Sequence, residues 1–397
     1  MGARHIVGRP RMIRHILCCV ALTHGLSVGL EGQDSGAWRA SFAAGEEARR
    51  MGDVALYARE MAAAADLLPF GDPNRPVVQY HAARAAALSR RGSESVEWLR
   101  ALWEEDIAPL MVSFAEEDRA FDGVRDSAVF RELMRQVAAL TLSARRLGGD
   151  VFLITGAGAN IVARVASDGV VLVDTGYGPT LPALRRTISQ LGGDEVDVVI
   201  VTHPHEDHMG SAATLGAQAH VYAHAATATA MSEPYVFMEG VSIPPKPPAA
   251  LPDTRVESPM SIQFGSEQIR LQPTEAHSAG DISVYFTDAR VAHLGDAFLA
   301  SNPMMYPGTV DPDAFLDRLE GFLDEMHPES VVVGGHEGVT DLPAVRRQIA
   351  VTREAMRFVR AAIENGRSVE ETAEAGRDRF PPAWTAFFYQ LFTQLGV

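Results

Sequence analysis

Two kinds of hydrophobic spacing divide the chain. From Ser41 to Leu140, apolar side chains recur every three or four residues, which is the period of an amphipathic helix. The positions that set this period are Val54, Tyr57, Met61 and Ala65, then Val77, Tyr80, Ala83 and Ala87, and later Trp98, Leu99 and Leu102. We therefore predict an all-α region, which we assign to residues 35–147.

After Leu147-Gly148-Gly149 the pattern changes to short β-branched runs separated by Gly and Asp. The runs are Val151–Ile154, Ile161–Val165, Val170–Val173 and Val196–Val201. Runs of this kind are typical of strands in a largely buried sheet.

From Leu342 onward the spacing is helical again, with Val351, Met356, Val359 and Ala362 expected on one packed face. A phenylalanine-rich end, with Phe380, Phe387, Phe388 and Phe392, is expected either to cover a core edge or to form a dimer contact. The pattern predicts an α/β domain over residues 148–397.

The helical region contains two segments that echo each other, Ala48–Asp53 and Ala87–Ser93, and each precedes a helix. Helix pairs joined by Gly-containing turns resemble tetratricopeptide units, and here the resemblance covers about two degenerate repeats. It implies a protein partner for this region. A plain helical bundle that only packs on the other domain accounts for the same pattern.

The first thirty residues have the layout of a secretory signal peptide. Arg9, Arg11 and Arg14 precede a mostly apolar stretch, Ile16–Leu30, which contains the small-x-small triplet Ser27-Val28-Gly29. We therefore expect a signal peptide over 1–30 and a secreted or periplasmic protein. If the segment is instead a disordered or mis-started N-terminus, a cytoplasmic protein is expected.

Composition narrows the chemistry. The 397 residues are 47% hydrophobic and carry a formal net charge of −16, which is typical of a soluble protein without a membrane span and disfavours nucleic acid as a partner. The two cysteines, Cys18 and Cys19, are adjacent and lie near the N-terminus. Any metal bound by the rest of the chain must therefore be held by nitrogen and oxygen.

Metal-binding residue types are concentrated directly after the strand predicted at Val196–Val201. The segment reads Thr202-His203-Pro204-His205-Glu206-Asp207-His208. Residues two apart point the same way in an extended chain, so His203 and His205 can share one ion. Asp207 and His208 then fall on the bend that follows and face a second ion. Imidazole and carboxylate ligands at this spacing suit zinc.

The pattern His203-x-His205-x-Asp207-His208 resembles the signature of the metallo-β-lactamase superfamily, and the resemblance extends from about Val151 to the C-terminus. It implies an αββα sandwich preceded by the helical domain, so that the overall class is α/β. Further matching segments are Asn160, Val170–Gly176, Glu275–Asp281, Ala292–Ala297 and Val333–Gly338. Within them, Asp174 would hold a ligand in its orientation.

The resemblance also implies a site with two Zn²⁺ ions. His203, His205 and His277 would bind one ion, Asp207, His208 and His336 would bind the other, and Asp296 would bridge them. The four histidines His220, His224, His293 and His327 match no ligand position and are interpreted as structural. A carboxylate at position 296 is typical of hydroxyacylglutathione hydrolases, lactonases and phosphodiesterase-like members of the superfamily.

The implied reaction is hydrolysis of an ester, lactone, thioester or amide in a small-molecule substrate, by a hydroxide held between the ions, with Asp207 orienting it. Three alternatives stay open: a β-lactamase, an iron-dependent sulfur dioxygenase of the same fold, and a partner-binding adaptor with a vestigial metal domain. The proline-rich stretch Met238–Pro259 is expected to lack regular structure and is a candidate lid. Lys246, the only lysine, is interpreted as a solvated loop residue, and Tyr306 as a loose match to a substrate contact.

Overall fold

The computed structural model describes residues 37–394, with gaps at 70–71, 73, 104–107, 239–240, 300–310 and 382–383. The expected signal peptide, with Cys18 and Cys19, and Tyr306 lie outside the described residues. The chain divides into two compact units. The first runs to Leu133 and includes Val236–Ile243, and the second comprises Met134–Tyr235 and the chain from Pro244 onward.

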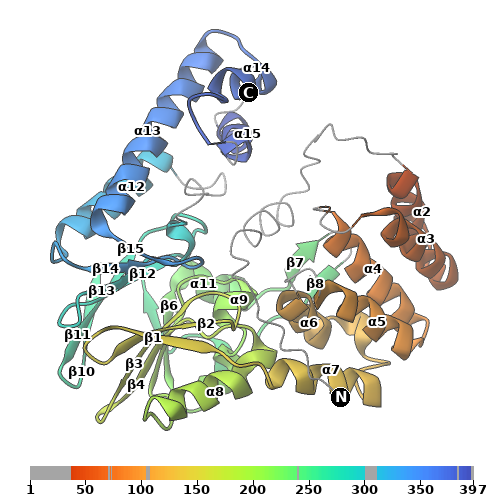
Figure 1. The fold of residues 1–397 in the computed structure, drawn as a ribbon, viewed down its shortest axis with the longest axis horizontal. Helices are drawn as coiled ribbons and strands as arrows, with labels where there is room; N and C mark the ends of the chain where they lie inside the picture. The colour runs from red at the N-terminus through yellow and green to blue at the C-terminus, as the bar shows by residue number, and fades with distance from the viewer. Residues whose placement is uncertain are drawn as a thin grey trace, which may run out of the picture. The chain divides into compact units, whose positions relative to one another are not determined.

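The first unit consists mainly of helices in which consecutive members contact each other (Figure 1). They are α2 (Ala37–Met51), α3 (Val54–Leu67), α4 (Arg75–Leu88), α5 (Gly92–Trp103), α6 (Ala108–Glu117), the short η1 (Arg119–Phe121) and α7 (Ala128–Ala138), whose last turns belong to the second unit. The turn into α3 uses Gly52 at a φ of +75°, and Asp53 Oδ1 then accepts a hydrogen bond from Leu56 N at 2.9 Å. The helical region is confirmed, whereas the tetratricopeptide resemblance stays a prediction.

A buried polar network lies inside this unit. The Tyr57 hydroxyl is 2.9 Å from His81 Nδ1, and the guanidinium of Arg84 contacts the carboxylate of Asp118 at 2.5 Å. Burial lowers the pKa of His81 to about 3 and raises the pKa of Tyr57 to about 12. His81 is therefore neutral at ordinary pH, and its Nδ1 can accept a hydrogen bond from the Tyr57 hydroxyl.

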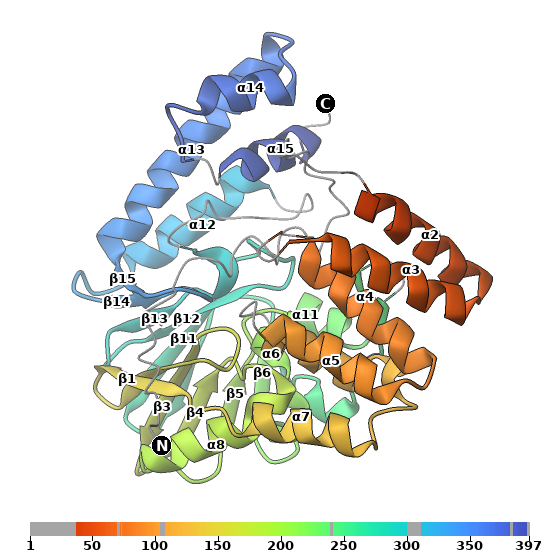
Figure 2. The ribbon, with the colours of Figure 1, turned by 45° about the vertical axis from the view of Figure 1, so that its right-hand side comes forward.

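The second unit contains two sheets that share one core (Figures 1 and 2). In the order in which they pair, the strands of the first sheet are β1 (Ser143–Gly148), β2 (Val151–Thr155), β3 (Ile161–Ala166), β4 (Gly169–Val173), β5 (Val198–Ile200), β6 (His220–His224) and β9 (Thr254–Val256). Those of the second are β10 (Met260–Phe264), β11 (Glu267–Pro273), β12 (Ile282–Phe286), β13 (Val291–His293), β14 (Val331–Val333) and β15 (Val339–Asp341). The pairs β4–β5, β5–β6, β6–β9 and β13–β14 are parallel, and the others are antiparallel.

Helices cover the outer face of each sheet. Against the first sheet pack α8 (Leu181–Gln190), α9 (Glu206–Met209), α10 (Ala212–Leu215) and α11 (Ala225–Met231). Against the second pack α12 (Pro312–Asp324) and α13 (Leu342–Glu364), and α15 (Thr385–Gln394) contacts α13 and α14 (Val369–Gly376). The order helix, sheet, sheet, helix confirms the αββα sandwich.

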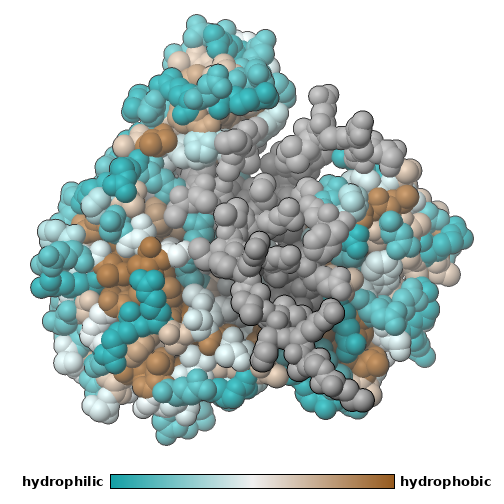
Figure 3. Space-filling model, viewed as in Figure 1, coloured by the Kyte–Doolittle hydropathy of each residue, from teal (hydrophilic) through white to brown (hydrophobic). Residues whose placement is uncertain are grey.

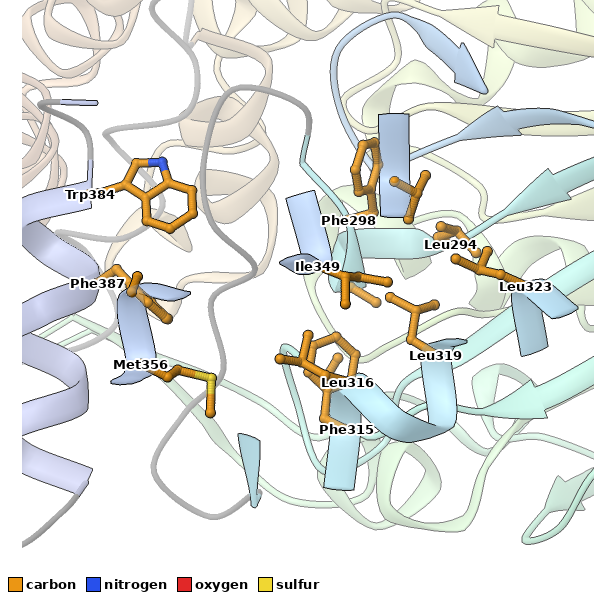
Figure 4. Close-up of a cluster of buried hydrophobic side chains, with 14 of the residues drawn as sticks. Leu294, Phe298, Phe315, Leu316, Leu319, Leu323, Ile349, Met356, Trp384 and Phe387 are labelled. Atoms are coloured by element: carbon orange, nitrogen blue, oxygen red, sulfur yellow. The ribbon is translucent and has the colours of Figure 1, made fainter. Parts of the chain in front are cut away.

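The C-terminal helices contribute buried side chains to the hydrophobic core over the second sheet. Figure 4 shows Phe315 and Leu319 of α12, Met356 of α13 and Phe387 of α15 in one cluster. Phe380, Phe387, Phe388 and Phe392 are all buried in it, so the phenylalanine-rich end covers a core edge. The outer surface around α13 and α14 in Figure 3 is largely hydrophilic.

Two expectations from hydrophobic spacing need correction. Val351 is 36% exposed, because the buried stripe of α13 runs through Ile349, Thr352, Met356 and Val359 and leaves Val351 outside it. The first sheet begins at β1, before position 148, since Arg145 and Arg146 on this exposed edge strand give it no apolar run. The proline-rich stretch is also more regular than expected, with β8 (Val241–Ile243), η3 (Pro248–Ala250) and β9.

Candidate metal centre

The seven residues of the expected ligand set lie where strands end. β5 leads through Thr202 into His203 and His205, and α9 then carries Asp207 and His208. In the second sheet, β13 leads to Asp296 in η4 (Gly295–Ala297), its parallel neighbour β14 leads to His336, and His277 lies between β11 and β12. The amide of Ile282 donates to the carbonyl of Thr202 at 2.9 Å, which ties the two loop regions together.

The first group consists of His203, His205, His277 and Asp296, whose ligand atoms all lie within 4.8 Å of one another. His205 Nδ1 is 2.9 Å from His203 Nε2 and 3.0 Å from His277 Nε2. Asp296 Oδ2 is 3.8 Å from His203 Nε2 and 3.6 Å from His277 Nε2. Three imidazole nitrogens and one carboxylate oxygen therefore converge on one point.

The second group consists of Asp207, His208 and His336. Asp207 Oδ2 is 3.2 Å from His336 Nε2 and 3.6 Å from His208 Nε2. The other oxygen of Asp296, Oδ1, faces this group, at 3.4 Å from His208 Nε2 and 3.6 Å from His336 Nε2. One carboxylate thus presents one oxygen to each group. The backbone makes room for it, because a Cβ atom at Gly335 would lie 1.8 Å from Asp296 Oδ1.

The donor set fits two zinc-type ions. Zn–N bonds of about 2.1 Å in a tetrahedral site put ligand atoms roughly 3.3 Å apart, which matches the separations above. His208 Nε2 and Asp296 Oδ1 are buried and have no hydrogen-bond partner among the described residues. Buried polar atoms are normally satisfied, and a cation held by these two atoms would supply the partner that each lacks among the described residues.

Burial and charge shift the pKa values of the ligands in opposite directions. Burial, together with neighbouring imidazoles, lowers the pKa of His203 well below its usual value and that of His205 to about 3. For His336, burial opposes protonation, but the carboxylates of Asp296 and Asp207 outweigh it and raise the pKa to about 10. Burial also raises the pKa of Asp207, yet His208 and His336 outweigh it and lower that pKa to about 2. The second group therefore favours a positive charge.

Asp174 holds His208 in place. Its Oδ2 accepts a hydrogen bond from His208 Nδ1 at 2.7 Å, and its Oδ1 accepts one from the Thr202 amide at 2.8 Å. The Thr202 hydroxyl donates to Asp174 Oδ2 at 2.8 Å and lies 3.1 Å from His203 Nδ1. With Nδ1 as the donor, His208 turns Nε2 toward the cluster, which is the orientation that a metal ligand needs.

Two further residues shape the loops that carry His277 and His336. Asp281 accepts hydrogen bonds from the amides of Ala276, His277 and Ser278, and from the Ser278 hydroxyl. Asn160 Nδ2 donates to the carbonyls of Gly334 and Glu337 at 2.9 and 3.0 Å. The sequence pattern includes both residues in its matching segments but does not reveal what they hold.

The four histidines expected to be structural lie outside both groups. His293 is buried, accepts a hydrogen bond from Gly295 N at 3.0 Å and donates to the carbonyl of Asn160 at 3.1 Å. His224 accepts from Ala226 N at the start of α11, and His327 accepts from Glu329 N. His220 is exposed and lies 2.9 Å from the Thr254 hydroxyl.

Residues 154–337, which include both groups, match the family model described as Metallo-beta-lactamase superfamily. The chain carries a metallo-β-lactamase superfamily domain. Members of this superfamily are metal-dependent hydrolases, and the His and Asp groups of the structure agree with metal binding. The matched region is shorter than the stretch over which the sequence resemblance was expected, because it stops before the C-terminal helices.

Named proteins resemble parts of this metallo-β-lactamase-fold chain. A hydroxyacylglutathione hydrolase from Acidiphilium cryptum (strain JF-5) is 29% identical over 150 residues, which are 37% of this chain and 53% of that protein. The chain thus spans about half the length of this curated relative.

Solved structures resemble it as well. A double mutant of the sec-alkyl sulfatase PisA1 is 15% identical with a TM-score of 0.50, covering 66% of this chain and 51% of that one. The Rm3 metallo-beta-lactamase is 20% identical with a TM-score of 0.44, covering 56% and 95%. At 15% identity the likeness to the PisA1 structure shows the fold alone.

The interpretation of Lys246 as a solvated residue is wrong. Its Nζ lies 2.6 Å from Glu206 Oε2, and the side chains are only 8% and 6% exposed. Glu206 stands between two residues of the expected ligand set, so this contact ties the proline-rich stretch to the metal-binding loop. Among the described residues, no helix is both long and apolar enough to cross a membrane.

Proposed function

We propose that the protein is a hydrolase with two zinc ions that cleaves an ester, lactone, thioester or amide bond in a small molecule. The observation that carries the proposal is Asp296, which directs Oδ2 to the three-histidine group and Oδ1 to the group of Asp207, His208 and His336. When bound, the ions would acidify a water molecule and polarise the scissile carbonyl group.

The burial of the ligands indicates where the substrate approaches. His203 and His208 are fully buried, whereas the side chains of His277 and His336 are 20% and 21% exposed. His205 of the first group is partly exposed as well, so the exposed edges of the ligand set come from both groups. A scissile bond that approaches between His277 and His336 would lie across both groups.

Asp207 is the residue placed to direct the reaction. Its carboxylate lies beside His336 in the second group, so it can accept a hydrogen bond from the attacking water and take up its proton. In the first group, Asp296 is the only carboxylate, and the other three residues, His203, His205 and His277, are imidazoles. This division supports a carbonyl-polarising role for the first group and a water-orienting role for the second.

The sequence relative favours a thioester or ester among the candidate bonds. Hydroxyacylglutathione hydrolase is the printed name of the Acidiphilium cryptum protein, and the carboxylate at position 296 is the residue expected for that kind of enzyme. The aligned part covers about half of that protein, so its substrate is carried over only as the first compound to test.

The proposal is tested by metal analysis together with a substrate panel. We expect about two zinc ions per chain after reconstitution, and turnover of at least one member of a set containing a glutathione thioester, a lactone, nitrocefin and a phosphodiester. His205→Ala should abolish that turnover, whereas His220→Ala, at an exposed histidine outside both groups, should retain it. Near-normal turnover by His205→Ala would refute the proposal.

The alternatives correspond to distinct results in the same experiment. One iron per chain, with oxygen consumption on a persulfide substrate, would replace the hydrolase by a sulfur dioxygenase. Turnover of nitrocefin alone would identify a β-lactamase. A chain that binds no metal and turns over nothing, yet binds a protein through its helical unit, would be an adaptor.

A further inference from the structure

A buried ion pair lies directly beside the ligand groups. Lys246 is the only lysine among 397 residues, and its Nζ lies 2.6 Å from Glu206 Oε2. Both side chains are less than one tenth exposed. Breaking a buried ion pair by removing one partner is strongly destabilising, because the remaining charge loses that partner inside the protein.

Glu206 occupies the position between His205 and Asp207, but its carboxylate belongs to neither ligand group. It is the first residue of α9, and its carbonyl accepts the hydrogen bond from Gly210 N at 2.8 Å that closes this single turn. The turn carries His205 at its start and Asp207 and His208 within it. Fixing Glu206 therefore fixes the backbone from which three ligands project.

Lys246 is itself held firmly. Prolines flank it on both sides, which restricts the backbone, and its amide donates to the carbonyl of Met231 at 2.8 Å. Immediately after it, η3 packs on α10, where Ala250 shares a core with Ala212 and Leu215. A Cβ atom at Gly216 would lie 2.2 Å from the carbonyl oxygen of Ala249, which shows how closely the two segments approach. The segment around Lys246 is thus held in place by a backbone hydrogen bond and by core packing.

We propose that Lys246 is a positioning residue for the metal centre, which acts through Glu206 to hold the turn that carries His205, Asp207 and His208. The inference rests on the proposed function, since it assumes that these three residues bind metal. It gives the segment around Lys246 a fixed role in supporting the turn that carries these residues.

The test compares three variants with the wild-type protein: Lys246→Met, Glu206→Gln and the double variant Glu206→Met with Lys246→Met. Zn²⁺ affinity is measured by competition with a chromogenic chelator, and folding by thermal unfolding of the metal-free chain. Replacing both charges with apolar side chains should restore folding, because no unpaired charge remains. We expect zinc affinity to stay at least about tenfold weaker in the double variant, as for other residues that orient ligands.

A matched control is the ion pair of Arg164 with Asp168, in which the guanidinium lies 2.7 Å from the carboxylate. It closes the turn between β3 and β4, at the end of β4 opposite to Asp174. Arg164→Met should keep zinc affinity within about twofold of wild type, since distant sites act independently. Lys246→Arg, which keeps the charge, should recover part of the affinity that Lys246→Met loses.

A second readout does not depend on metal. In the folded protein, an amine-specific reagent should modify the peptide containing Lys246 slowly, and Glu206→Gln should accelerate that reaction by about tenfold or more as the pair opens. Equal labelling in both proteins, or a double variant with wild-type zinc affinity, would overturn the positioning role. A wild-type protein that binds no Zn²⁺ would instead remove the proposed function, which separates the two failures.

Discussion

Asp174 Oδ2 accepts a hydrogen bond from His208 Nδ1 at 2.7 Å, and the backbone of Asp174 adopts a φ of +65°. Few residue types other than glycine adopt this conformation readily, and Asp and Asn are among those that do. This strained residue is therefore in direct contact with His208, a member of the expected ligand set. The position therefore combines a backbone requirement with a chemical one.

Asp174→Asn separates these two requirements. Asparagine tolerates the same backbone conformation, but its amide nitrogen would face the Nδ1 proton of His208. His208 would then favour the tautomer with a proton on Nε2, which blocks metal binding in the second group. We expect zinc affinity at that group to fall by about 10- to 100-fold, measured by stepwise zinc titration. Two unchanged binding steps would contradict the role given to Asp174.

Asp296→Asn tests whether one residue serves both groups. The amide keeps the size of the side chain but removes the charge and offers an acceptor on one side only. We therefore expect the zinc content to fall from about two ions to one or none per chain, measured by elemental analysis of the purified protein. Thr187→Ala, at a buried residue of α8 outside both groups, is a suitable control. Two retained ions would show that Asp296 does not bridge.

Asp281 organises the loop that carries His277, and two substitutions test whether its hydrogen bonds determine zinc affinity. Its carboxylate accepts hydrogen bonds from three backbone amides and one hydroxyl. Asp281→Ala leaves the buried amide of Ala276 without this partner, at a cost of about 1–3 kcal/mol, and the three half-buried donors at a smaller cost. Asp281→Asn keeps one acceptor oxygen and should be milder. We expect both variants to lose affinity at the first group, Ala more than Asn, in the same zinc titration. Wild-type zinc affinity in both variants would argue against this loop as a determinant of the site.

The sequence predicted much of the sandwich because its strands are buried on both faces. Runs such as Val170–Val173 are apolar at every position, which only a sheet covered on both sides explains. The edge strand β1 was not predicted, since Arg145 and Arg146 are exposed there. Val351 was misplaced because its spacing from Met356 and Val359 fits a stripe only if the neighbouring Ile349 and Thr352 are ignored.

The site residues likewise divide into those that the local sequence predicts and those that it does not. His203, His205, Asp207 and His208 are close in sequence, so their convergence needs only a sharp turn after a strand. His277, Asp296 and His336 were placed by resemblance to a family, because nothing local brings them to the same point. The supporting contacts of Lys246 with Glu206 and of Asp281 with its own loop depend on tertiary packing, which hydrophobic spacing does not encode.

His81 makes a prediction for the helical unit that is independent of metal. Its pKa of about 3 in the folded protein lies below the ordinary value of about 6.5 expected after unfolding, so the unfolded chain binds more protons between these two values. The stabilisation is thus complete above about pH 6.5 and is lost as the pH falls. Between pH 6.5 and pH 5 the loss amounts to about 1.6 kcal/mol.

His81→Gln should remove that pH dependence, because glutamine can still accept a hydrogen bond from Tyr57 but does not titrate near neutral pH. We expect the unfolding free energy of the helical unit to fall less between pH 6.5 and pH 5 in this variant than in wild type, as measured by chemical denaturation at each pH. His220→Gln, at an exposed histidine, is the control and should follow the wild-type curve. Parallel curves for wild type and His81→Gln would mean that His81 becomes protonated without opening the core, and that the buried carboxylate of Glu46, 3.5 Å away, accommodates the charge.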